Sequence, residues 1–169
     1  MTERHHDIAL TVNGEEVRER VDARTTLVDL LRDTLSLTGS HVGCEHGFCG
    51  ACTVKVDGAV VRGCLMLAVQ CDGASVETIE GLSDAGAIAD LQEAFRARNA
   101  LQCGFCTPGM LITAQDLLTN KDLLARGGVP TRDHIRAHLS GNYCRCTGYH
   151  AIVDAVEAVA QARNGGAQE

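Results

Sequence analysis

The first half of the chain alternates apolar with polar or small residues in short stretches, each about as long as one β-strand. Asn-Gly and Asp-Gly pairs, which type I′ turns prefer, separate two pairs of these stretches. The sequence therefore predicts two hairpins, with strands at 8–12 and 15–21 around Asn13-Gly14 and at 53–56 and 60–62 around Asp57-Gly58. Further stretches at 65–70 and 75–79 are expected to complete a small mixed sheet.

Between the two hairpins, leucines recur at helical spacing. They would share one face of a short helix, with Asp29 favourably placed in its first turn. Thr25 or Thr26 is expected to cap this helix, which should stop near Gly39. The leucines in question are Leu27, Leu30, Leu31 and Leu35.

In the second half the hydrophobic period changes from two to about 3.6 residues, which predicts helices. We expect a domain boundary here, with one domain at 1–80 and the other at 81–169. Four helices are predicted. The first carries Ile88, Leu91 and Phe95; the second, capped by Thr107 with Pro108 at its first position, carries Leu111, Ile112, Gln115 and Leu118. After a loop through Gly127, Gly128 and Pro130, the third is capped by Thr131 and carries Ile135 and Leu139; the fourth carries Ile152, Val153, Val156 and Val159. The expected fold class is α+β.

Composition narrows the possible functions. The 169 residues carry a net charge of −7, which argues against a nucleic-acid partner. The polar first residues, 1–7, do not resemble a secretory signal, and no apolar stretch is long enough to span a bilayer, so a cytoplasmic location is expected. There are only three Phe, two Tyr and no Trp, and glycine-rich phosphate-binding motifs are absent. Any organic cofactor is therefore expected on another chain.

A cysteine loop at 44–52 carries the strongest chemical signal. Cys44, Cys49 and Cys52 have the spacing C-x₄-C-x₂-C, and Cys64 follows after the second hairpin. This is the plant-type [2Fe–2S] spacing, in which one tightly wrapped loop supplies three thiolates. Interspersed glycines, expected to adopt positive φ, would let backbone N–H groups approach the sulfurs. They are Gly43, Gly47 and Gly50.

Zinc binding and disulfide formation are two other uses of such cysteines. Structural zinc sites usually consist of two short cysteine pairs separated by a longer gap, which does not match one wrapped loop. Disulfides are disfavoured because the chain has nine cysteines, an odd number, and no evident secretory signal. A hairpin, a helix, a ligand loop and a second hairpin follow one another in the order of a β-grasp ferredoxin.

The second half contains another set of four cysteines, Cys103, Cys106, Cys144 and Cys146. Cys106 and Cys146 each stand directly before a predicted helix. Helix N-termini favour negative charge, so two such helices could share an anionic cluster. We expect a second iron–sulfur cluster here, with zinc as the alternative.

Three motifs together resemble the iron–sulfur subunit of the molybdenum hydroxylases, the xanthine dehydrogenase family. They are GCEHGFCGACTV, QCGFCTPGM and GNYCRCTGYHAIVDAV, and the resemblance extends from about Ile8 to Val159. It implies a β-grasp domain followed by a four-helix domain, each with one [2Fe–2S] cluster. The eight cysteines named above match the family's ligand positions.

The resemblance also implies partners and a direction of electron flow. Such a subunit joins a large molybdopterin subunit, whose cofactor is expected as the cytosine dinucleotide, and a medium FAD subunit, in a heterotrimer or its dimer. Gln102 matches a position that contacts the pterin, and Cys146 matches the ligand beside it. Electrons would pass from molybdenum to the helical-domain cluster, then to the N-terminal cluster and FAD. This chain would be a non-catalytic subunit, without catalytic residues of its own.

Cys71 lies outside the motifs and is expected to be a small buried side chain near the sheet. Two other functions remain as alternatives: a zinc-bound scaffold or interaction module, and a free-standing ferredoxin. The substrate of the complex is open, because oxidation would take place on the large subunit. Purines, N-heterocycles, aldehydes, carbon monoxide and aromatic thioesters all fit.

Overall fold

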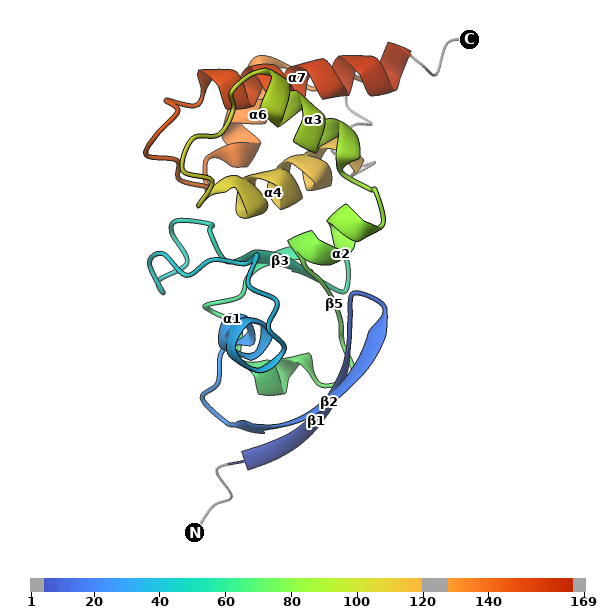
Figure 1. Ribbon diagram of the computed structural model, residues 1–169, viewed down its shortest axis with the longest axis vertical. Coiled ribbons are helices and arrows are strands. Elements are labelled where there is room, and N and C mark those ends of the chain that lie inside the picture. The colour runs from blue at the N-terminus through green and yellow to red at the C-terminus, as the bar shows by residue number, and fades with distance from the viewer. Residues whose placement is uncertain (1–4, 120–127, 166–169) are drawn as a thin grey trace.

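The computed structural model describes residues 5–119 and 128–165. A five-stranded sheet with a short helix lying across it forms one end of the molecule, and a group of helices forms the other (Figure 1). The fold class is α+β, as predicted.

The sheet is mixed, with strand order β2-β1-β5-β3-β4. Strand β1 pairs with β2 antiparallel and with β5 parallel, and β3 pairs antiparallel with both β4 and β5. Strand β5 therefore joins the two hairpins into one sheet. The strands are β1 (His5–Val12), β2 (Glu15–Asp22), β3 (Thr53–Val56), β4 (Ala59–Arg62) and β5 (Ser75–Glu77).

Both predicted hairpin turns are confirmed. Asn13 and Gly14 have φ values of 52° and 87°, and Asp57 and Gly58 have 49° and 81°. Positive φ at both central residues is the signature of a type I′ turn, whose twist matches that of the flanking strands.

The leucine helix begins as predicted but ends early. It consists of α1 (Leu27–Asp29) and a π-helical turn (Leu30–Thr34), and the Thr26 hydroxyl caps it by accepting the Asp29 N–H at 3.2 Å. The predicted end near Gly39 is wrong, because the chain leaves the helix after Thr34 and packs Gly39 against the start of α2 (Ile79–Asp84). A side chain at residue 39 would collide with Ile79.

The predicted strand at 65–70 is also wrong. This segment makes a single bridge, between Leu67 and Thr26, and then forms a 3₁₀ helix (Ala68–Cys71). The Ala68 N–H makes this bridge by donating to the Thr25 carbonyl, whereas the Leu67 N–H donates to the Gln70 side chain and is not available to a strand partner. The predicted strand at 75–79 is shorter than expected, because Ile79 already begins a helix.

The second half is helical, as expected, with one additional short helix at its start. Among the described residues of this half, the helices are α2 (Ile79–Asp84), α3 (Ala89–Ala97), α4 (Thr107–Thr119), α6 (Arg132–Leu139) and α7 (His150–Gly165). The apolar residues predicted for the four helices are all buried, and Thr131 caps α6 by accepting the His134 N–H. Gly128 and Pro130 lie in a loop as predicted; Gly127 lies outside the described residues.

Two predicted helix starts need correction. In α4 the Cys106 carbonyl accepts the Met110 N–H, so Cys106 occupies the capping position and Thr107 is already the first helical residue. The fourth helix begins at His150 and not directly after Cys146. Gly148 and Tyr149, with φ values of 67° and 70°, turn the chain before this helix.

Each half has its own hydrophobic core. The N-terminal core lies between the sheet and the leucine helix, and the helical core includes Ile79 from α2. The precise boundary between the two domains, predicted after residue 80, stays a prediction. Within the described ranges, no helix has the length and apolar character needed to cross a membrane.

Candidate metal centres

The N-terminal cysteine loop at 44–52 surrounds its first cysteine with backbone donors. The N–H groups of His46 and Cys49 both point at Cys44 Sγ, each at 3.4 Å. These donors, with Cys49 the stronger, lower the pKa of Cys44 to about 6. The loop therefore stabilises a thiolate, the form in which cysteine binds metal.

Glycine is required at one position of this loop by a close approach. Gly50 has φ 71°, and a Cβ there would lie 2.6 Å from both the Asn142 amide nitrogen and the Gly141 carbonyl oxygen. Gly47 also has positive φ, as predicted, whereas Gly43 does not. A Cβ at Gly43 would instead lie 3.1 Å from Cys49 Sγ.

Cys52 and Cys64 complete the first set. Burial raises the pKa of Cys52 to about 11; a Cys64 backbone N–H opposes this shift, while the thiols of Cys64 and Cys49 add to it. The Gly63 N–H donates to the Cys52 carbonyl at 3.0 Å, which holds Cys64 beside the loop. The structure thus brings together the four cysteines predicted for the first cluster.

The second set comes from two segments, the loop before α4 and the loop between α6 and α7. Cys103 Sγ and Cys146 Sγ lie 3.5 Å apart. Burial, and then the neighbouring Cys144 thiol, raise the pKa of Cys106 to about 12. The four thiols thus form two pairs, Cys103 with Cys146 and Cys106 with Cys144.

These donor sets suit a two-iron cluster. Each iron of a [2Fe–2S] cluster takes two cysteine thiolates, and each set supplies four thiols. In residues 5–119 and 128–165, no three His, Cys, Asp or Glu side chains converge closely enough to ligate one ion. The identity of the eight ligands stays a prediction.

Gln102 connects the two segments of the second set. Its side chain is exposed, and its Nε2 donates to the Cys146 carbonyl at 3.0 Å. Cys146 is exposed as well. The two residues predicted to bind the pterin cofactor thus lie together at the surface, while their contact with a pterin stays a prediction.

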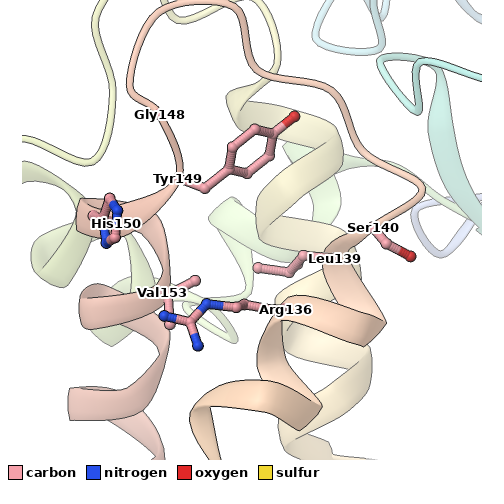
Figure 2. Close-up of a pocket in the computed structure, with 7 residues that line it drawn as sticks. All are labelled: Arg136, Leu139, Ser140, Gly148, Tyr149, His150 and Val153. Atoms are coloured by element: carbon pink, nitrogen blue, oxygen red, sulfur yellow. The ribbon is translucent and has the colours of Figure 1, made fainter.

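The loop that carries Cys144 and Cys146 is held by Tyr149. Its hydroxyl accepts the Cys144 N–H at 2.8 Å, and its ring packs against the helical core. These contacts hold Tyr149 at positive φ, a costly conformation for a residue with a side chain. Tyr149 also lines a pocket of about 280 Å³ between α6 and α7, with Arg136 and His150 among the other lining residues (Figure 2).

A hydroxyl beside Cys144 influences its charge. Burial favours the neutral thiol, but the Thr147 hydroxyl, 3.2 Å away, and nearby backbone N–H groups outweigh burial and lower the pKa of Cys144. Sequence reasoning missed both Thr147 and Tyr149 as site residues. For Thr147 the sequence does contain a signal, because threonine follows cysteine in both Cys106-Thr107 and Cys146-Thr147.

A buried polar network joins the two domains. Asn142, 1% exposed, donates from Nδ2 to the Gly50 carbonyl at 3.2 Å, and its Oδ1 accepts the Thr113 hydroxyl at 3.1 Å. Arg62 donates to the Gly141 carbonyl at 2.9 Å and to the Thr53 hydroxyl at 2.7 Å. The sequence prediction missed this network. Its one local signal is Thr113, a hydroxyl within the apolar run of α4.

The two cysteine-bearing regions also touch directly. The Tyr143 N–H, next to Cys144, donates to the Cys49 carbonyl at 2.8 Å. His41 stacks on Phe105 with ring centroids 4.6 Å apart, and His41 Nδ1 lies 2.7 Å from the Phe105 carbonyl oxygen. The loop between α1 and β3 lies on the same side of the molecule as the loops entering α4 and α7 (Figure 1). The two predicted cluster sites are therefore neighbours.

Cys71 lies apart from both sets. It is fully buried in the N-terminal core, as predicted, and burial raises the pKa of its thiol. Its thiol lies 3.8 Å from the Leu67 carbonyl oxygen, within the same 3₁₀ turn. The described contacts give Cys71 a packing role.

Comparison with known families agrees with the two cysteine sets. Residues 10–79 match the family described as 2Fe-2S iron-sulfur cluster binding domain, and residues 78–157 match the [2Fe-2S] binding domain family. The chain therefore contains two [2Fe–2S]-binding domains, of which the first is the β-grasp domain and the second is helical.

Individual proteins match over nearly the full chain. The gamma subunit of caffeine dehydrogenase from Pseudomonas sp. (strain CBB1) is 53% identical over 154 residues, covering 91% of this chain and 90% of that subunit. The small subunit of nicotine 6-hydroxylase from Paenarthrobacter nicotinovorans is 53% identical over 150 residues, covering 89% and 87%. A chain of quinoline 2-oxidoreductase from Pseudomonas putida 86 has a TM-score of 0.85 at 48% identity, covering 97% and 99%.

The fold, the paired cysteines and these relatives define an electron-transfer subunit of an oxidoreductase complex. The chain belongs to the small iron–sulfur subunits of the molybdenum hydroxylases, the xanthine dehydrogenase family.

Proposed function

We propose that this subunit carries electrons from a molybdopterin site on a large partner subunit to FAD on a medium partner subunit. The eight predicted cysteines hold the two clusters: Cys44, Cys49, Cys52 and Cys64 in the N-terminal domain, and Cys103, Cys106, Cys144 and Cys146 in the helical domain. When bound, each cluster takes up and releases one electron at a time.

The chain's own residues suggest the direction. Electrons enter at the exposed end of the helical domain, where Gln102 and Cys146 face a partner. They leave from the N-terminal domain, whose cysteine loop is exposed at Phe48. Between these ends, the Tyr143 N–H bonded to the Cys49 carbonyl gives a short covalent and hydrogen-bonded link from Cys144 to Cys49.

This link is the observation that carries the proposal. A subunit that relays electrons needs two cluster sites held close together and in fixed relation, and a scaffold with two independent metal sites does not. The hydrogen bond from Tyr143, the stacked pair of His41 and Phe105, and the buried amide of Asn142 all hold the two cysteine regions together.

Membership of this family supports the following partners. The large subunit holds the molybdopterin cofactor, in its cytosine dinucleotide form, and carries out substrate oxidation. The medium subunit holds FAD, and the three chains form a heterotrimer or its dimer in the cytoplasm. The substrate belongs to one of the substrate classes that the sequence leaves open. The relatives named for caffeine, nicotine and quinoline favour an N-heterocycle.

Copurification tests the proposal. The chain is tagged, expressed with the products of the genes that flank its own, and purified at high salt. Molybdenum, pterin, flavin and two further polypeptides should elute with it. Elution of the chain alone, with its iron and sulfide intact, would indicate a free-standing ferredoxin, and elution with zinc in place of iron would indicate a scaffold.

A further inference from the structure

The helical-domain cysteine set contains a side-chain hydroxyl aimed at a predicted ligand sulfur. Thr147 Oγ1 lies 3.2 Å from Cys144 Sγ. The same oxygen accepts the Tyr149 N–H at 3.2 Å. Thr147 is thus held between a donor on one side and a sulfur on the other.

This arrangement decides which atom donates. A thiolate bound to metal has no proton, so the hydrogen bond to Cys144 Sγ needs its proton from the Thr147 hydroxyl. The Tyr149 N–H occupies a lone pair of the hydroxyl oxygen, which leaves the hydroxyl proton free to point at the sulfur. Tyr149 also fixes the far end of the loop, because its own hydroxyl accepts the Cys144 N–H at 2.8 Å.

Hydrogen bonds to ligand sulfurs stabilise the additional negative charge of a reduced cluster and so raise its reduction potential. In the N-terminal set the backbone supplies such donors, through the N–H groups of His46 and Cys49. In the helical set, Thr147 supplies one from a side chain that can be replaced.

We propose that the Thr147 hydroxyl raises the reduction potential of the helical-domain cluster by donating a hydrogen bond to Cys144 Sγ. The inference rests on the proposed function, in which Cys144 is a cluster ligand. Thr147 is a positioning residue that acts through Cys144 and touches no substrate.

The test replaces the hydroxyl by a group of nearly the same shape. Thr147→Val removes the donor, Thr147→Ser keeps it, and Thr119→Val removes a hydroxyl that donates to the Gln115 carbonyl within its own helix, away from both cysteine sets. The midpoint potentials of both clusters are measured in the assembled complex by redox titration followed by electron paramagnetic resonance. Thr147→Val should shift the helical-domain cluster to a more negative potential and leave the N-terminal cluster unchanged. Thr147→Ser and Thr119→Val should leave both potentials at the native values.

Two outcomes would overturn the inference: an unchanged potential in Thr147→Val, or an equal shift in Thr147→Ser. Should the valine variant not assemble its cluster, Thr147→Ala, which adds no bulk beside the sulfur, is titrated in its place against the same criteria. Failure of the proposed function is distinguishable, because the native chain would then purify without its partner subunits or would lack a second cluster signal, and both are seen before any variant is titrated.

Discussion

The two cysteine sets do the same chemical task with different parts of the chain. In the N-terminal set, one wrapped loop supplies three of the four thiols, and backbone N–H groups point at Cys44. In the helical set, two separate segments supply two thiols each. Gln102 connects the two segments through its hydrogen bond to the Cys146 carbonyl, whereas Tyr149 and Thr147 contact Cys144 from within its own segment. The first site is therefore determined mainly by local chain geometry, and the second by tertiary packing.

This difference has a consequence for substitution. Backbone donors stay when a side chain is replaced, so the N-terminal site should be sensitive to its cysteines and close-approach glycines and tolerant elsewhere. The helical site depends on hydrogen bonds from side chains, which substitution can remove, and on the packing of two loops. The relation between the sites depends on Asn142 and its partners, which belong to both domains.

The largest effect is expected from Cys49→Ser. Loss of one thiolate should damage the N-terminal cluster and leave the helical cluster reducible by substrate. Flavin reduction should then fail, because the electrons have no exit. Rapid mixing of the assembled complex with substrate, followed by visible absorption, measures both steps.

Circular dichroism and gel filtration of Cys49→Ser serve as controls for folding and docking. The proposed order of electron flow is wrong if substrate no longer reduces the helical-domain cluster in this variant while the flavin is reduced at its normal rate.

Asn142→Ala should have the next largest effect. It leaves the Thr113 hydroxyl without one of its acceptors and removes a buried donor to Gly50, at a cost of about 1–3 kcal/mol in the free energy of unfolding. Denaturant unfolding of the full chain measures the loss. Asn164→Ala, at an exposed position on α7, is the matched control and should change stability little. Equal losses in the two variants would show that the network contributes nothing specific.

Gln102→Ala should have a smaller effect that is confined to the entry side. Removing the hydrogen bond to the Cys146 carbonyl should lower the free energy of unfolding of the chain by about 0.5–1.5 kcal/mol, since the site is exposed and water can replace the amide. Transfer from molybdenum should slow or the complex should assemble less tightly, while the N-terminal cluster keeps its spectrum. A changed N-terminal signal with normal entry would contradict this assignment.

Cys71→Ala should have the smallest effect on the clusters. Cys71 packs in the N-terminal core, so its loss should lower stability slightly and preserve both cluster spectra. The measurement is visible and paramagnetic spectroscopy beside a thermal unfolding curve. Loss of one cluster without general unfolding would mean that the ligand set has been misassigned.

The sequence predicted those features that depend on neighbouring residues. Asn13-Gly14 and Asp57-Gly58 specify their turns without help from distant chain, and the apolar stripes of the helices follow from spacing alone. The spacing of Cys44, Cys49 and Cys52 is local in the same sense. The grouping of the N-terminal set was expected for this reason, and the grouping of the helical set was expected from cysteines placed before two predicted helices and from the family resemblance.

Features that depend on distant contacts were missed. The leucine helix ends at Thr34 because Gly39 must pack against α2, and residues 65–70 leave the sheet to bond Thr25 and Thr26. Asn142 reaches a carbonyl in the other domain, which no local pattern indicates. The helical cysteine loop turns at Gly148 and Tyr149 before its helix begins, so the apparent repeat of Cys106-Thr107 and Cys146-Thr147 differs in backbone geometry.

One chain should hold two [2Fe–2S] clusters in different surroundings. Iron and acid-labile sulfide analysis, combined with electron paramagnetic resonance of the fully reduced complex, tests it most directly. We predict about four irons and four sulfides per chain and two distinct signals. A fully active complex with zinc in either site, or with iron and sulfide for only one cluster, would contradict the account.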